Sequence, residues 1–331
     1  MAQRTPPEIK KILVIKLSAL GDFVLALAAI KKIREVHRQA HITLLTTPPF
    51  GALAKASPYF NAVEIDGKPE GMSEWLGLRT RLKRARYDRV YDLQTSSASA
   101  RIFHLLSPFP PPWSGITFGA GLPHRNPRRD HMHTLERQAD QLKAAGIWPD
   151  APTEPGAAPP PDLSWINTAA GKSRPTEAGL KPRPYVMMIP GGSAHRLDKR
   201  WPVAKFGELA QGLYAYGYDI VVIGGPQESP LGREIQRFVG KARDLTGRTD
   251  FAGVARMGAK AALVIGNDTG PLHLAAATGA PTIVLFSAAS DPALSAPRGH
   301  VVVLQAPALE ELDVATVAQA AIALIPSLGA A

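Results

Sequence analysis

Short apolar runs alternate with longer segments of helical periodicity through the first 150 residues. An apolar run bounded by turn residues is typical of a buried strand, whereas apolar positions three and four residues apart are typical of a helix. The strands predicted on this basis are 12–15, 41–46, 62–65, 89–93 and 115–118, and the helices are 23–37, a short one near Leu53, 74–86, 97–106 and 133–145. Strands that alternate with helices indicate a parallel sheet covered on both faces.

A proline-rich segment at 149–161 interrupts this pattern and predicts an extended linker. The alternation then restarts, with predicted strands at 185–189, 219–223, 243–245, 262–265, 281–286 and 300–304, and predicted helices at 203–216, 230–239, 251–260, 271–278 and 314–325. We therefore expect an α/β protein of two doubly wound, Rossmann-like domains, residues 1–160 and 161–331. Ligands of such sheets bind at the carboxyl ends of the strands, so we expect a central cleft that both sheets face.

The composition narrows the chemistry. The chain has 331 residues, enough for two cores, and it has no cysteine, which excludes disulfides, thiolate zinc sites and a cysteine nucleophile. No apolar run is long enough to span a bilayer, and no signal sequence is recognisable. We therefore expect a cytoplasmic protein.

The charge is unevenly distributed. The formal net charge is +10; residues 1–170 hold 22 basic and 15 acidic side chains, and the remaining residues hold 16 and 13. We expect the N-terminal half to attract acidic partners, including the surface of an anionic membrane. Basic residues cluster at 79–89, interpreted most simply as a solvated helix face, and at 125–129 in a loop, where binding residues concentrate. No nucleic-acid recognition motif accompanies them, so nucleic acid is not expected as a partner.

The first loop with unusual residues is 16–22, after the first predicted strand. Asp22 stands where a helix is predicted to begin. Two interpretations are open: a carboxylate that caps the helix, or a general base with Lys16 beside it.

A second loop, 190–202, combines two glycines with Ser193, Lys199 and Arg200, and Pro202 marks the next helix start. Glycines allow close approach of the backbone to a ligand, and cations before a helix favour an anion. The loop therefore predicts a phosphate site. It matches neither a P-loop nor a dinucleotide-binding fingerprint, which disfavours a nicotinamide dehydrogenase.

Two further loops follow predicted strands. Glu228 comes after two glycines, where it could accept hydrogen bonds from ribose hydroxyls or a base amine, or cap a helix. The segment 266–273 places Asp268 before a helix that begins at Pro271, so several N–H groups would face a ligand. Asp268 could also act as a cap, and His273 could be a packed core histidine.

Three spaced motifs, in order, resemble glycosyltransferase family 9, which contains the ADP-heptose:lipopolysaccharide heptosyltransferases. They are Lys16-x-Ser18-x2-Gly21-Asp22, Lys199-Arg200-Trp201-Pro202 and Asp268-Thr269-Gly270-Pro271-x-His273, with smaller matches at Asp92-Leu93-Gln94 and His133-x2-Glu136-Arg137. The resemblance implies a GT-B fold with an acceptor-binding N-terminal domain, a nucleotide-sugar-binding C-terminal domain and a last helix that packs back on the first domain.

The resemblance also implies roles. Asp22 would be the catalytic base. The donor-binding residues would be Ser193 and Lys199 at the phosphates, Glu228 toward ribose or adenine, and Asp268, Thr269, Gly270, Pro271 and His273 around the diphosphate and sugar. The candidate acceptor-binding residues are Lys16, Ser18, Gln94, Arg125, Arg128 and His133.

The implied reaction is inverting transfer of a heptose from ADP-heptose to a Kdo-containing lipid A core, the anionic acceptor of lipopolysaccharide synthesis, at the inner face of the cytoplasmic membrane. No cofactor is expected, and no essential metal, because no acidic pair has metal-ligand spacing. Ser287 stands where family members commonly have glycine and is expected to narrow the donor pocket. Alternatives are a GT-B transferase for another nucleotide sugar, a nucleotide-sugar epimerase and a non-catalytic sugar-binding protein.

Overall fold

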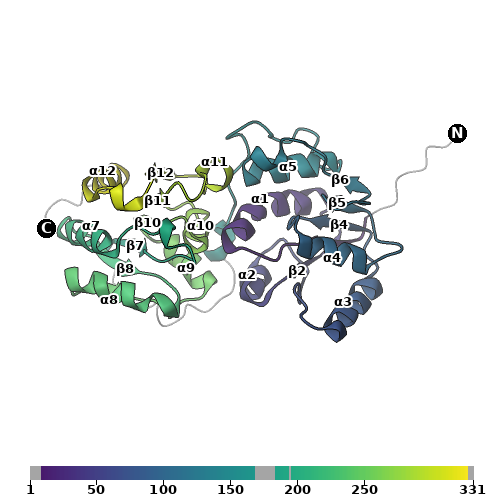
Figure 1. Cartoon of the computed structure of the whole chain (residues 1–331), viewed down its shortest axis with the longest axis horizontal. Coiled ribbons are helices and arrows are strands. Elements are labelled where there is room, and N and C mark those ends of the chain that lie inside the picture. Colours follow the sequence, from purple (N-terminus) through teal and green to yellow (C-terminus); the bar gives the residue numbers. More distant parts are fainter. Residues whose placement is uncertain (1–8, 168–182, 194, 327–331) are drawn as a thin grey trace. The chain divides into compact units, whose positions relative to one another are not determined.

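The computed structural model describes residues 9–167, 183–193 and 195–326 (Figure 1). By its internal contacts the chain divides into two compact units, each built on its own sheet. Unit 1 consists of Met1–Ala19 and Ala26–Pro159. Unit 2 consists of Pro160–Ala331 together with Leu20–Leu25, the first residues of helix α1.

Unit 1 is built on a six-stranded parallel sheet of order β3-β2-β1-β4-β5-β6. Its strands are β1 (Lys11–Ile15), β2 (His41–Thr46), β3 (Ala62–Ile65), β4 (Arg89–Asp92), β5 (Trp113–Gly115) and β6 (Leu122–Pro123). Its helices are α1 (Leu20–Val36), α2 (Gly51–Ala56), α3 (Met72–Ala85), α4 (Ser97–Leu105) and α5 (Thr134–Ala144).

The predicted strand at 115–118 is misplaced along the chain. The chain is in strand conformation earlier, at β5, where Trp113 pairs with Val90 of β4 and is fully buried. Ile116 and Phe118 follow the strand and are 41% and 95% exposed. The apolar residues that suggested a strand here therefore lie outside the core, and a short strand, β6, that was not predicted follows them.

Unit 2 is built on a second six-stranded parallel sheet, of order β12-β11-β10-β7-β8-β9. Its strands are β7 (Tyr185–Ile189), β8 (Asp219–Val222), β9 (Arg243–Asp244), β10 (Leu263–Asn267), β11 (Thr282–Phe286) and β12 (Val301–Gln305). Its helices are α7 (Val203–Ala215), α8 (Ser229–Phe238), α9 (Phe251–Gly258), α10 (Gly270–Ala276), α11 (Pro292–Ser295) and α12 (Val314–Leu324).

The central strands of both sheets are apolar along their whole length because both faces are covered. Every residue of β7, β10 and β11 is buried, as are the last four residues of β1. Continuous burial is typical of parallel sheets with helices on both sides. It explains why the strands appear in the sequence as uninterrupted apolar runs.

Helix α12 packs within unit 2, against α7, where Val317 and Ala321 join the core cluster that contains Leu209 and Leu213. The expectation from the resemblance was that the last helix packs back on the N-terminal domain. That expectation stays a prediction: Val317 and Ala321 are buried in unit 2, whereas Ile322 on the same helix is 48% exposed. None of the helices in the described ranges is long and apolar enough to cross a bilayer.

Candidate functional site

Four neighbouring strands of unit 2, in the order β11, β10, β7 and β8, lead into the loops that carry the candidate donor residues. Since all four are parallel, their carboxyl ends meet at one edge of the sheet. The strand order reverses between β7 and β10, and ligands of doubly wound sheets bind at such a switch point. The loop after β7 and the acidic turn after β10 flank it.

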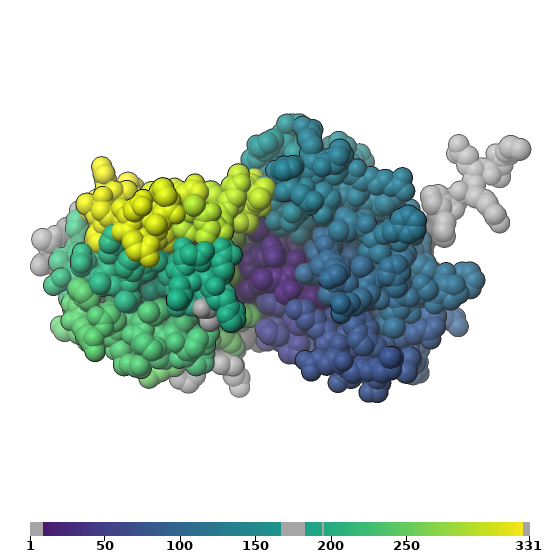
Figure 2. All heavy atoms as spheres, in the orientation of Figure 1, coloured from purple at the N-terminus to yellow at the C-terminus, as the bar shows by residue number. Residues whose placement is uncertain are grey.

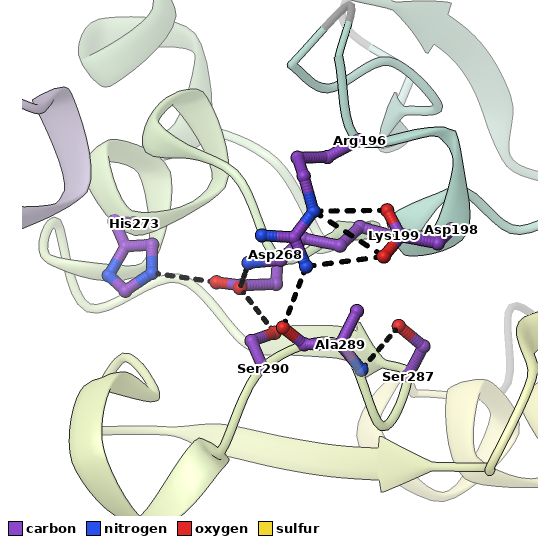
Figure 3. Close-up of polar contacts among 8 residues, drawn as sticks. All are labelled: Arg196, Asp198, Lys199, Asp268, His273, Ser287, Ala289 and Ser290. Atoms are coloured by element: carbon purple, nitrogen blue, oxygen red, sulfur yellow. Dashed lines mark hydrogen bonds and ion pairs between the residues drawn. The ribbon is translucent and has the colours of Figure 1, made fainter.

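Asp268, directly after β10, contacts polar side chains from the loop after β7, the loop after β11 and helix α10 (Figure 3). Its Oδ2 accepts hydrogen bonds from Lys199 Nζ and Ser290 Oγ, both at 2.9 Å, and its Oδ1 lies 3.4 Å from His273 Nε2. The structure therefore brings together Lys199, Asp268 and His273, three of the predicted donor residues. Ser290, from the loop after β11, was not predicted.

The Asp268 carboxylate is strongly held in its charged form. Burial raises its pKa, but the hydrogen bonds and charges of His273 and Lys199 outweigh burial and lower the pKa to about 2. The side chains of Lys199 and Asp268 are only 21% and 10% exposed, so water screens their ion pair incompletely. The charges of Asp268 and Lys199 offset each other in this ion pair. An anionic ligand must therefore compete with Asp268 for the ammonium group of Lys199.

The amino end of α10 lies directly beside this cluster. Thr269 precedes the helix in an extended conformation, with φ −144° and ψ 156°, Gly270 begins it and Pro271 is in its first turn. The first N–H groups of a helix lack partners within it. Within the described ranges Thr269 Oγ1 is buried and has no hydrogen-bond partner, which is unusual for a hydroxyl. These groups suit the oxygens of an anion.

Glu228 joins two glycine loops through its carboxylate. Its Oε1 accepts a hydrogen bond from the N–H of Gly192 at 2.7 Å, and its Oε2 accepts one from the N–H of Gly225 at 2.6 Å. The residue is 9% exposed. The bond from Gly225 is the capping contact of one sequence interpretation, at the start of the short 3₁₀ helix Pro226–Glu228. The bond from Gly192, which fixes the loop after β7 to the loop after β8, was not anticipated.

The glycine at position 191 is required by the Glu228 carboxylate. A Cβ at Gly191 would lie 1.8 Å from Glu228 Oε1, so the carboxylate would have to move. We expect Gly191→Ala to destabilise the protein by about 1–3 kcal/mol, the usual cost of overpacking, and to weaken ADP binding. Denaturant unfolding and calorimetry measure both effects. Gly212→Ala is the control, since nothing lies within 4 Å of a Cβ there; equal stability of the two variants would contradict the prediction.

Two further residues shape the loop after β7: Asn267, which sequence reasoning missed, and Arg200, a cation of the predicted phosphate loop. Asn267 Nδ2 donates to the carbonyl of Pro190 at 2.8 Å, and its Oδ1 accepts from the N–H of Trp201 at 3.0 Å. Arg200 Nη2 donates to the carbonyls of Gly192 at 2.6 Å and Ser193 at 3.2 Å. An asparagine just past the apolar run 262–265 is a signal in the sequence that could have revealed the first of these contacts.

The loop after β11 is tied to the loop after β7. Arg196 Nη2 donates to the carbonyl of Ala289 at 2.8 Å, and the guanidinium also pairs with Asp198 (Figure 3). Ser287 is 2% exposed, and its Oγ accepts from the N–H of Ala289 at 3.2 Å. The hydroxyl of Ser287 therefore bonds within its own loop. Ser193 is exposed, and the contacts above use its carbonyl.

In unit 1 the switch point lies between β1 and β4, and a glutamine joins the loops that follow these strands. Gln94 Oε1 accepts hydrogen bonds from the N–H groups of Leu17 at 2.9 Å and Ser18 at 3.1 Å. Asp92 is fully buried and accepts from the N–H of Gln94 at 3.1 Å, and burial raises its pKa. Lys16 is 4% exposed. Gln94 and Ser18 thus stabilise the loop that leads to α1.

Asp22 lies in the first turn of α1, which begins at Leu20, earlier than predicted. It is the third residue of the helix and does not hold the capping position that precedes a helix. Its side chain is half-buried. A carboxylate in a first turn interacts favourably with the positive end of the helix. The segment Leu20–Leu25 that contains it groups with unit 2.

The basic loop of unit 1 divides into exposed and structural residues. Arg125 and Arg128 are exposed. His133 is buried and caps α5, where its Nδ1 accepts from the N–H of the second helical residue at 3.2 Å. Arg129 belongs to the basic cluster at 125–129 but not to the candidate acceptor residues, and it donates from Nη2 to Thr95 Oγ1 at 3.3 Å, beside the loop after β4. Within residues 9–167, 183–193 and 195–326 no group of three or more His, Asp or Glu could hold a metal ion.

Comparisons with known proteins agree with this architecture. A family model described as glycosyltransferase family 9 (heptosyltransferase) matches residues 75–313. Lipopolysaccharide heptosyltransferase 2 of Escherichia coli (strain K12) is 26% identical over 317 residues, 88% of this chain and 86% of that protein.

Among solved structures, E. coli ADP-heptose lps heptosyltransferase II has a TM-score of 0.77 at 23% identity, over 95% of this chain and 98% of that one. E. coli heptosyltransferase WaaC with ADP has a TM-score of 0.71 at 20% identity, over 93% and 98%. The predicted GT-B architecture of two doubly wound sheets is confirmed.

Proposed function

Because this chain belongs to glycosyltransferase family 9, the heptosyltransferase family, we propose that it transfers a heptose from ADP-heptose to the inner core of lipopolysaccharide. The observation that carries the proposal is the cluster of Lys199, Asp268 and His273 beside the amino end of α10. It combines an ammonium group, an unpartnered buried hydroxyl and helix N–H groups at a switch point, which suits a diphosphate.

In the donor complex, Lys199 leaves Asp268 for the diphosphate, and the N–H groups and hydroxyl at the start of α10 contact its oxygens. Asp268 keeps His273 and Ser290 as partners, so its charge does not become isolated. Glu228 already accepts two backbone N–H bonds, and its remaining acceptor capacity serves the ribose hydroxyls.

The transfer forms one bond and breaks another. Asp22 accepts the proton of the acceptor hydroxyl as that oxygen bonds to the anomeric carbon, and the bond from this carbon to the phosphate oxygen breaks. The electron pair leaves with ADP, which gains negative charge at the phosphate. Lys199 and the N–H groups at the start of α10 stabilise that charge electrostatically. The chemistry is metal-independent.

The acceptor is anionic and binds unit 1, whose basic loop presents Arg125 and Arg128 to solvent. Their guanidinium groups suit carboxylates and phosphates of a Kdo-containing lipid A core. Gln94 and His133 hold the loops around the acceptor through bonds with backbone N–H groups, and Lys16 and Ser18 are further acceptor-binding residues. The enzyme works in the cytoplasm, at the inner face of the membrane.

The test is transfer by the purified chain from ADP-heptose to delipidated Kdo-containing core, in EDTA. We expect acceptor-dependent release of ADP, an inverted linkage in the product and displacement of the donor by ADP more readily than by UDP or GDP. Turnover of the donor without acceptor would indicate an epimerase instead. Preference for UDP or GDP would indicate a transferase for another nucleotide sugar, and a requirement for added Mg²⁺ would overturn metal independence.

A further inference from the structure

One face of α3 presents apolar and basic side chains to solvent. Met72, Leu76, Arg79 and Lys83 are spaced by four, three and four residues, so they form a single stripe along the helix. Met72 is 77% exposed and Leu76 54% exposed, although both are large and apolar. Leu78 and Leu82, on another face of the helix, are buried in the core of unit 1, so the helix does not need the exposed stripe for its own packing.

The loop after α4 extends this stripe with an aromatic residue. Phe109 is 89% exposed and stands between Pro108 and Pro110, which restrict its backbone. Two side chains of the stripe hold the loop: Lys83 Nζ donates to the carbonyl of Ser107 at 3.3 Å, and Arg79 Nε donates to that of Leu105 at 3.0 Å. Phe109, Lys83 and Arg86 line one hollow of about 330 Å³. We call Met72, Leu76, Lys83, Arg86 and Phe109 the α3 surface.

The charge of α3 itself is positive, since the helix carries four basic side chains and one acidic side chain, Glu74. Arg81 pairs with both Glu64 and Asp66. The Glu74 carboxylate accepts from the N–H of Glu70 at 2.8 Å at the start of the helix. Asp88 accepts from the N–H groups of Lys10 and Lys11. Lys83, Arg84 and Arg86 remain exposed at the far end of α3. Figure 2 shows this part of unit 1, in blue, at the surface.

We propose that the α3 surface docks on an anionic membrane, with Met72, Leu76 and Phe109 inserted at the interface and Lys83 and Arg86 on lipid phosphates. Interfacial binding combines buried apolar side chains with cations that attract anionic headgroups, and this surface has both. A rigid aromatic between prolines inserts with little loss of conformational entropy. The inference rests on the proposed function, because a lipid-linked acceptor would bring the enzyme to that surface.

The experiment measures binding of the full chain to vesicles by co-sedimentation. We expect binding to vesicles that contain phosphatidylglycerol and little binding to pure phosphatidylcholine. Lys83→Glu with Arg86→Glu should weaken binding by at least about tenfold, since each cation near an anionic surface contributes severalfold. Met72→Ser with Leu76→Ser and Phe109→Ser should weaken it by at least about tenfold as well, through lost apolar burial. Inorganic phosphate at the same charge concentration should not compete.

Matched controls lie on unit 2: Ile322→Ser removes an apolar side chain that is 48% exposed, and Lys241→Glu reverses an exposed cation. Both should bind vesicles as the wild type does. Transfer to the delipidated acceptor should be unchanged in the α3 variants, which shows that they fold and separates this test from that of the activity. Failure of the wild type to bind phosphatidylglycerol vesicles, or equal binding by wild type and α3 variants, would overturn the proposal.

Discussion

Replacing Asp22 with asparagine is expected to lower kcat for heptose transfer by about 10²–10⁴-fold, the usual contribution of a positioned general base. The amide keeps the size and much of the hydrogen bonding of the carboxylate, but it cannot accept the proton of the acceptor hydroxyl. The affinity for ADP should change little, because the variant leaves Lys199 and the start of α10 intact. Steady-state kinetics with purified acceptor and calorimetry with ADP measure the two quantities separately.

A second effect of this substitution must be separated from catalysis. A carboxylate in the first turn of a helix stabilises it by about 0.3–1 kcal/mol, so Asp22→Asn should lower the melting temperature slightly. Glu35→Gln is the matched control, since Glu35 is exposed near the other end of the same helix. Near-normal turnover of Asp22→Asn with purified acceptor would assign Asp22 a structural role in α1.

Much of the fold was predictable because buried parallel strands are apolar on both faces. The predicted strands at 185–189 and 281–286 agree with β7 and β11 to within one residue. The pattern failed where apolar side chains do not enter the core, as at Ile116 and Phe118. A local hydrophobic pattern indicates which residues prefer burial, but it does not indicate which other elements of the fold cover them.

The site was predictable to the level of its loops and not to the level of its contacts. Glycines, cations and acids after the strands marked the loops that hold Lys199 and Asp268. The contacts between Glu228 and Gly192, 36 residues apart, and between Asn267 and Pro190, 77 residues apart, depend on which strands are neighbours. The order of the sheet sets these pairs, and no local signal in the sequence carries that order. Ser290 was missed for the same reason, since its partner Asp268 lies on the preceding strand's loop.

Replacing Lys199 with alanine is expected to weaken ADP binding by roughly 10–100-fold, because a hydrogen bond to a charged group contributes about 1.5–3 kcal/mol. In the free protein this ammonium group is paired with Asp268, so the substitution also removes a partner of a buried carboxylate. The pKa of Asp268 should therefore rise above its value of about 2, although His273 continues to lower it. Calorimetry with ADP and an NMR titration of the carboxyl group check the two effects.

The sign of the accompanying stability change follows from that pKa. A carboxyl whose pKa is lower in the folded than in the unfolded state stabilises the fold above its unfolded pKa, and this contribution is lost as the pH falls through the folded value. Lys199→Ala brings the two values closer and should make the protein unfold at a higher pH during acidification. Lys241→Ala, an exposed lysine elsewhere in unit 2, should change neither quantity. If ADP affinity were unchanged in Lys199→Ala, the ammonium group would serve only to neutralise Asp268, and the diphosphate site would depend on the start of α10 alone.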